Sequence, residues 1–153
     1  MPGTEWCYRS VVAHPRPRKL VLIIEDDLAS RRMYAGELRQ AGFDVIEAHN
    51  GLQAVEKASE AVPDAIVTDL GLPGIDGFEL CRRIHLDPKL SQIPLVAITG
   101  RYFSPADIAR ARREGCHAVL LKPFVPDDLI AELKRVLDLQ RGAAQLNSYP
   151  PRP

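Results

Sequence analysis

The sequence VTDLGLPGIDGF, residues 67–78, decides how this chain folds. The apolar run that leads into it stops at Asp69, and glycines, a proline and an Asp–Gly pair follow. Glycine, proline and aspartate are the residues that turn a chain, each for its own steric reason. The pattern predicts a buried strand over 64–69, a turn, and a helix over 77–87. Asp69 is then either an ordinary polar residue of the turn or a reactive carboxylate at the edge of a sheet.

The same alternation of apolar strands and helical spacing runs through most of the chain. It predicts further strands at 19–24, 43–48, 93–99 and 117–122, and further helices at 29–42, 51–61, 104–115 and 125–140. Such alternation is typical of a parallel sheet covered by helices on both faces, where central strands are continuously apolar. We therefore predict an α/β fold: a doubly wound, five-stranded parallel sheet of order 2-1-3-4-5 with five helices, a flavodoxin-like three-layer sandwich.

The length of 153 residues fits one domain. Residues 1–18 contain three prolines and show no periodicity, so we expect a mobile N-terminal extension there. Residues 19–140 are expected to form the folded domain, and residues 141–153 a proline-containing C-terminal tail.

Composition argues against several classes of function. The net charge is zero, whereas a nucleic-acid-binding surface normally has a clear basic excess. The longest apolar run, residues 20–24, is too short to cross a membrane, and no signal peptide is evident, so we expect a cytoplasmic protein without a membrane partner. Cys7, Cys81 and Cys116 show no metal-ligand spacing and are interpreted as buried or incidental thiols of a reducing compartment.

Charged and polar residues follow four of the five expected strands, at the edge where ligands bind in such sheets. They are Glu25, Asp26 and Asp27 after the first strand, Asp69 at the end of the third, Thr99 at the end of the fourth, and Lys122 at the end of the fifth. Each has an ordinary explanation when taken alone; Asp27, for example, could cap the helix that follows it. Chance placement of the whole set at one edge is much less plausible.

This set of side chains favours phosphoryl transfer. Carboxylates from two strands would raise each other's pKa in one crevice, and a divalent cation such as magnesium would relieve that conflict. The ammonium of Lys122 suits a phosphoryl oxygen, Thr99 can donate a hydrogen bond, and a carboxylate can act as the nucleophile. The sequence contains neither GxxxxGK[ST] nor GxGxxG, so nucleotide binding is unsupported.

The chain resembles the receiver domains of bacterial two-component response regulators, of the single-domain type. The resemblance covers about residues 19–140 and is carried by four segments in the family's order: EDD, TDLGLPGIDG, AITG and LLKPF. It implies that Asp69 is the phosphoacceptor and that Thr99 and Lys122 hold the phosphoryl oxygens. It also implies a cis peptide bond between Lys122 and Pro123.

The resemblance further implies the metal site and the partners. Asp26, Asp27, Asp69 and the backbone carbonyl of Gly71 would bind Mg²⁺, or Mn²⁺ in its place. The phosphoryl group would come from a histidine kinase or a histidine phosphotransfer protein. The output would pass to a protein target or a second copy through the fourth helix, fifth strand and fifth helix. Catalysis would be limited to self-phosphorylation from a phosphodonor and slow autodephosphorylation.

Three positions depart from the usual receiver pattern or bear on its kinetics. Val119 stands where receivers commonly carry an aromatic residue whose rotation is coupled to the threonine, so an aromatic read-out is not expected. Gly71 offers no side chain near the attacking water, whereas Arg101 could reach over the pocket. The lifetime of the phosphoryl group therefore stays open in both directions.

Other functions stay as alternatives. A magnesium-dependent phosphatase with an aspartyl nucleophile typically needs a second aspartate two residues further on, where this chain has Gly71. An interaction module that is never phosphorylated would normally have lost an acidic residue, the threonine or the lysine, and only Val119 points that way. A flavin-binding protein would need a Ser/Thr/Gly-rich phosphate loop after the first strand, which is missing.

Overall fold

The computed structural model of the protein describes residues 18–100 and 104–147. The predicted N-terminal extension, apart from Arg18, lies outside the described residues, as does Arg101. No helix within the described ranges is both long and apolar enough to cross a membrane.

The described residues form a parallel sheet of five strands in the order β2-β1-β3-β4-β5, which confirms the predicted fold class and strand order. The strands are β1 (Leu20–Ile24), β2 (Asp44–Ala48), β3 (Ala65–Asp69), β4 (Leu95–Thr99) and β5 (Ala118–Leu121). The helices are α1 (Leu28–Gln40), α2 (Gly51–Ala61), α3 (Gly77–Leu86), α4 (Pro105–Arg113) and α5 (Pro126–Asn147).

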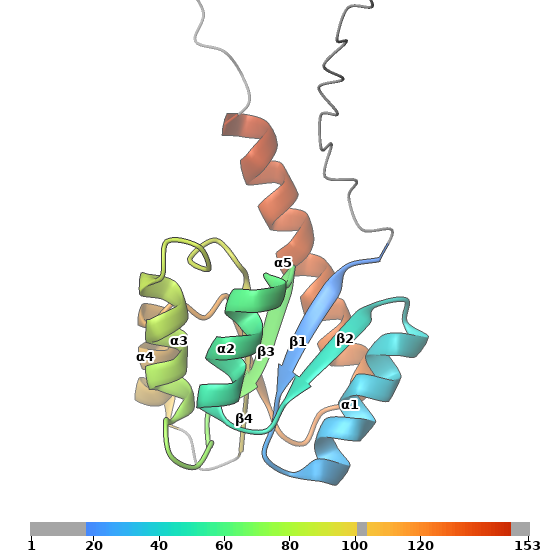
Figure 1. Cartoon of the computed structure of the whole chain (residues 1–153), viewed down its shortest axis with the longest axis vertical. Helices are drawn as coiled ribbons and strands as arrows, with labels where there is room; N and C mark the ends of the chain where they lie inside the picture. The colour runs from blue at the N-terminus through green and yellow to red at the C-terminus, as the bar shows by residue number, and fades with distance from the viewer. Residues whose placement is uncertain (1–17, 101–103, 148–153) are drawn as a thin grey trace, which may run out of the picture.

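Helices bury both faces of the sheet, as Figure 1 shows. Because side chains alternate along a strand, Val21 and Ile23 pack into a cluster with α1 and α5, whereas Leu22 and Ile24 pack with α2, α3 and α4. All four are at most 1% exposed. Burial on both faces explains why this strand is a continuous apolar run in the sequence.

Side-chain caps fix where four of the helices begin. Asp27, Asn50, Asp76 and Ser104 each accept a hydrogen bond from a backbone N–H in the first turn of the helix that follows. Ser104 and Asp107 form a reciprocal capping box, and Pro105 occupies the first turn of α4. The expected start of this helix is confirmed.

The last helix is longer than the sequence pattern predicted. It was expected to end at Gln140, but α5 continues to Asn147, into the segment that was expected to be a tail. The residues after Gln140 include alanine, glutamine and leucine, all good helix formers, and no proline comes before Pro150. In Figure 1 this end of α5 extends past the sheet, on the side opposite to the carboxyl ends of the strands.

Gly77 brings the start of α3 against the backbone that follows Asp69. Its N–H donates a hydrogen bond of 3.2 Å to the carbonyl of Leu70. A Cβ at this position would lie 2.4 Å from the Cα of Leu70 and 2.6 Å from the carbonyl oxygen of Asp69. The position therefore requires glycine because of close backbone approach, and α3 fixes the end of β3.

We expect Gly77→Ala to lower the free energy of unfolding by about 1–3 kcal/mol, the usual cost of overpacking, because the clash is with backbone. Gly36→Ala is the matched control, since Gly36 is also helical but a Cβ there would meet nothing within 4 Å. That substitution should stabilise the protein by about 0.5–1 kcal/mol. Urea unfolding of both variants measures the two effects, and equal changes would contradict this explanation.

Candidate functional site

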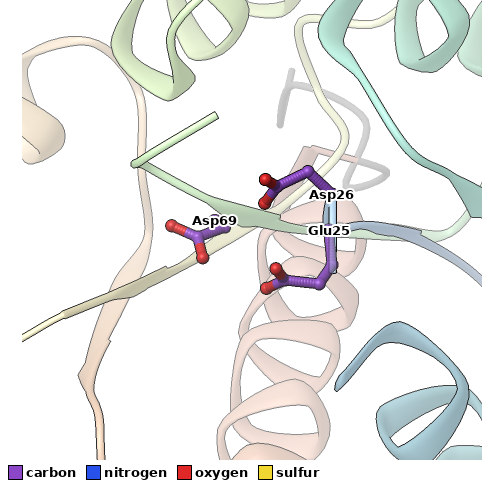
Figure 2. A group of neighbouring side chains, drawn as sticks. All are labelled: Glu25, Asp26 and Asp69. Carbon is purple, nitrogen blue, oxygen red and sulfur yellow. The ribbon is translucent and has the colours of Figure 1, made fainter. Parts of the chain in front are cut away.

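Three carboxylates meet at the carboxyl ends of β1 and β3. Asp69 is the last residue of β3, and Glu25 and Asp26 directly follow β1. Their side-chain oxygens lie within 4.8 Å of one another, and Figure 2 shows the three side chains gathered at this edge of the sheet. Glu25 is only 3% exposed and Asp69 only 9%, whereas Asp26 is exposed. Two of the three charges therefore have little contact with water.

Lys122, which follows β5, supplies the positive charge of this cluster. Its Nζ lies 2.8 Å from Oδ2 of Asp69 and 3.3 Å from Oε2 of Glu25. The backbone N–H of Lys122 donates to the carbonyl of Thr99 at 2.8 Å, which fixes the residue at the edge of the sheet. The peptide bond between Lys122 and Pro123 is cis, as expected.

The charges of the cluster shift the pKa values of its members. Burial, and then the negative charge of Asp69, raise the pKa of Glu25 to about 7, although Lys122 partly offsets this. Burial disfavours the charged form of Lys122, but its hydrogen bond to Asp69 and the charges of Asp69 and Glu25 outweigh burial. The pKa of Lys122 therefore lies above its ordinary value. One ammonium does not fully compensate two nearly buried carboxylates.

The donor set at this edge fits a hard divalent cation. Mg²⁺ prefers oxygen ligands, commonly uses only one or two carboxylates and retains several water molecules. Glu25, Asp26 and Asp69 offer oxygen ligands, and the exposure of Asp26 leaves one side of the cluster open to water. A cation here would also supply the positive charge that Lys122 alone does not provide.

Asp27 has a different role from the one predicted. Its carboxylate accepts hydrogen bonds from the backbone N–H of Ser30 at 2.9 Å and from the Ser30 hydroxyl at 2.6 Å, and so caps α1. These hydrogen bonds lower the pKa of Asp27. The predicted metal role of Asp27 is therefore not supported, and Glu25 lies in the cluster in its place.

The local geometry explains this exchange. Because β1 ends at Ile24, Glu25 is the first residue past the strand and remains beside β3. Two residues later the chain has already turned into α1, so Asp27 is in the N-cap position. The sequence signal was an aspartate directly before a helical pattern with a serine three residues on, which favours a cap.

Gly71 contacts the carboxylate of Asp69 through its backbone. Its N–H donates a hydrogen bond of 2.7 Å to Oδ1 of Asp69. A Cβ at position 71 would lie 3.3 Å from the same oxygen. Each oxygen of Asp69 thus has one donor, Gly71 for Oδ1 and Lys122 for Oδ2. The metal role of the Gly71 carbonyl stays a prediction.

Thr99 places a buried hydroxyl group at the end of β4, next to β3. It is the last residue of β4, fully buried, and pairs with Leu121 of β5, while Ile98 beside it pairs with Asp69. Its Oγ1 has no hydrogen-bond partner among the described residues. A buried hydroxyl without a partner costs about 1–3 kcal/mol, so this atom can gain from a ligand that offers an acceptor oxygen.

Comparisons with known proteins agree with this geometry. The family model described as "Response regulator receiver domain" matches residues 21–134. The polar-differentiation response regulator DivK of Brucella anthropi is 32% identical over 119 residues, 78% of this chain and 96% of DivK. The phosphate regulon transcriptional regulatory protein PhoB of Pseudomonas aeruginosa is 36% identical over the same length, 78% of this chain and 52% of PhoB. A putative response regulator from Chloroflexus aurantiacus superimposes with a TM-score of 0.74 at 33% identity, covering 79% of this chain and 98% of that structure.

Substitutions at Glu25 and Asp27 should distinguish a residue that binds Mg²⁺ from one that caps α1. We expect Glu25→Gln to weaken Mg²⁺ binding at least about tenfold, since it removes a charged ligand from the cluster. Asp27→Ala should leave Mg²⁺ affinity nearly unchanged but lower the free energy of unfolding by about 1 kcal/mol through loss of the cap. Calorimetric Mg²⁺ titration and urea unfolding of both variants measure these effects. If Asp27→Ala alone lost Mg²⁺ affinity, Asp27 and not Glu25 would be the metal ligand, as the sequence predicts.

In the presence of a chelator, the free energy of unfolding should depend on pH through Glu25. The pKa of Glu25 is higher in the folded protein than its ordinary value of 4.5, so the folded state binds the proton more tightly than the unfolded state. The contribution of Glu25 to stability is then complete below about pH 4.5 and is lost as the pH rises through about 7. Glu25→Gln should flatten this part of the profile. Identical slopes from pH 5 to pH 8 in the two proteins would contradict it.

Proposed function

The chain belongs to the response regulator receiver domain family of two-component signalling, and from this premise we propose that it is a phosphorylation-controlled switch. Asp69 accepts a phosphoryl group from a histidine kinase or a histidine phosphotransfer protein in a magnesium-dependent reaction. The observation that carries this proposal is the nearly buried carboxylate of Asp69 held at 2.8 Å by Lys122 within a three-carboxylate cluster. The reaction takes place in the cytoplasm.

In this mechanism each residue at the sheet edge has a separate task. Glu25, Asp26 and Asp69 would hold Mg²⁺ (or Mn²⁺), with the Gly71 carbonyl as a further ligand, and the bound ion would supply positive charge to neutralise the phosphoryl oxygens. An oxygen of Asp69 attacks the phosphorus atom while the P–N bond to the donor histidine breaks, and the imidazole leaves and takes up a proton from water. The Gly71 N–H and Lys122 hold the carboxylate in position for this attack. Lys122 then binds a phosphoryl oxygen, and Thr99 donates its free hydroxyl to another.

Phosphorylation changes the signalling surface through Thr99 and Lys122. The modification adds negative charge and acceptor oxygens at the ends of β4 and β5. The proposed surface is formed by α4, β5 and α5, and it binds a downstream protein or a second copy of the chain. Leu121 and Val125, which flank Lys122, are 48% and 59% exposed and give this surface apolar contact area. Val119 is partly buried against the core, so the change is transmitted without an aromatic side chain.

The chain is in this view a substrate that assists its own modification. It phosphorylates itself from a donor and slowly hydrolyses the resulting acyl phosphate, without turnover of a separate substrate. Gly71 has no side chain that could serve as the general acid of an aspartyl phosphatase, which argues against that alternative.

We expect the protein to gain one phosphoryl group on incubation with Mg²⁺ and a small acyl-phosphate donor, as measured by intact mass. Asp69→Asn should gain none, and omission of Mg²⁺ should give the same result. Thr99→Ala should still fold and should accept the group more slowly, because one donor to the phosphoryl oxygens is lost. A folded, Mg²⁺-loaded protein that gains no mass would instead be an interaction module that is never phosphorylated.

A further inference from the structure

Two buried cysteines lie in contact on the face of the sheet that α3 and α4 cover. Cys81 belongs to α3 and is fully buried, and Cys116, in the turn between α4 and β5, is 6% exposed. Their Sγ atoms are 3.2 Å apart, and both residues are free thiols. This contact is not visible in the sequence, because the two positions are separated by 35 residues. Both were predicted to be buried or incidental thiols, and the structure shows that both are buried.

Packing on either side of the pair fixes the two segments that carry it. The guanidinium of Arg110 in α4 lies 4.2 Å from the centre of the Phe78 ring in α3. The ring of His85, at the other end of α3, is so close to Gly115 that a Cβ there would lie 3.0 Å from it. Gly115 has a φ of +107°, which allows the turn before Cys116. The thiols are thus held together by the fold and not by chance rotamers on a mobile surface.

We propose that Cys81 and Cys116 are a site of reversible oxidation, forming a disulfide that joins α3 to the turn leading into β5. The oxidant is a low-molecular-weight disulfide. The proposal does not depend on phosphorylation of Asp69, and neither thiol takes part in the mechanism described above. In a reducing compartment the pair stays as two thiols, so the disulfide forms when conditions become oxidising.

The reaction proceeds by two thiol–disulfide exchanges. The thiolate of Cys116 attacks one sulfur of the small disulfide, whose S–S bond breaks, and the first small thiol leaves with the proton lost by Cys116. Cys81 then loses its proton and attacks the Cys116 sulfur, and the second small thiol leaves with that proton. Two electrons pass from the protein thiols to the reagent, and one protein disulfide and two small thiols result.

The order of attack follows from the surroundings of the two sulfur atoms. Cys116 is 6% exposed and Cys81 is not exposed at all, so Cys116 is the more accessible of the two and is the first to react in this proposal. The hydrogen bond to Cys116, together with burial, raises the pKa of the Cys81 thiol, which keeps Cys81 protonated until a mixed disulfide has formed beside it. The contact of 3.2 Å then favours the second exchange over release of the first adduct.

The disulfide would add a covalent bond between α3 and the turn that leads into β5. It would close the chain from residue 81 to residue 116, a loop that contains β4 and α4. A crosslink that closes such a loop stabilises the folded protein relative to the unfolded chain. Any effect on binding at the surface of α4, β5 and α5 rests on the proposed function, but formation of the bond does not.

The test uses the full chain with Cys7→Ser, which leaves only the buried pair. The folded protein is equilibrated with hydroxyethyl disulfide, and the reaction is quenched with an alkylating reagent in denaturant. The intact mass of the protein is then measured by mass spectrometry. We expect both thiols to be lost without a mixed adduct, and tryptic peptides 58–82 and 114–134 to be linked. Retention of both thiols, a stable adduct, or a link between two chains would overturn the proposal.

Two further measurements exclude trivial explanations. With Cys81→Ala in the Cys7→Ser background, Cys116 should stop at the mixed disulfide, whereas Cys116→Ala should leave Cys81 unmodified while the protein is folded. The oxidised pair should raise the urea midpoint of the Cys7→Ser protein, and a reducing agent should reverse the shift. An unchanged or lower midpoint would show that the bond does not fit the fold. Asp69→Asn should form the disulfide normally, which separates this proposal from the phosphorylation proposal.

Discussion

The structure of the site depends on a charge balance at one edge of the sheet. A single ammonium, that of Lys122, lies between the nearly buried carboxylates of Asp69 and Glu25. Placing charges away from water is costly, and mutual attraction repays that cost only when every charge has a partner. Here the partners are unequal in number, and burial together with the charge of Asp69 raises the pKa of Glu25. Among the described residues, a further cation would complete the charge balance at this edge.

The topology of the sheet makes this arrangement possible. All five strands are parallel, so their carboxyl ends meet at the same edge. With β3 between β1 and β4, the carboxylates of Glu25 and Asp69 come from adjacent strands, and Lys122 reaches them from β5. Gly77 then secures the end of β3, because α3 can approach the backbone of Asp69 and Leu70 only where no Cβ intervenes.

Sequence reasoning succeeded where a feature is encoded locally. Strand and helix alternation, the start of the helix at 104 and the polar residues at strand ends all depend on neighbouring residues, and the structure agrees with them. It placed Asp27 in the acidic cluster, where the structure has Glu25, because the choice depends on where β1 ends, to within one residue. It ended α5 too early, since alanine and leucine after Gln140 continue a helix without adding a clear apolar period. It also missed the contact of Cys81 with Cys116, which arises only when α3 packs beside α4.

The unsatisfied groups of the resting site match the groups that a phosphorylated, metal-bound site would bring. Thr99 has a buried hydroxyl without a partner among the described residues, at a cost of about 1–3 kcal/mol. Glu25 and Asp69 share the ammonium of Lys122. In the proposed mechanism a bound cation would balance the carboxylates and free Lys122 to bind an anion, and phosphoryl oxygens would give Thr99 an acceptor. A core optimised for stability alone would place apolar side chains at these positions. Their polarity is best explained by a second state of the site, with a cation and a phosphoryl group bound. Binding in that state would offset the free-energy cost of the unpaired hydroxyl and the nearly buried carboxylates.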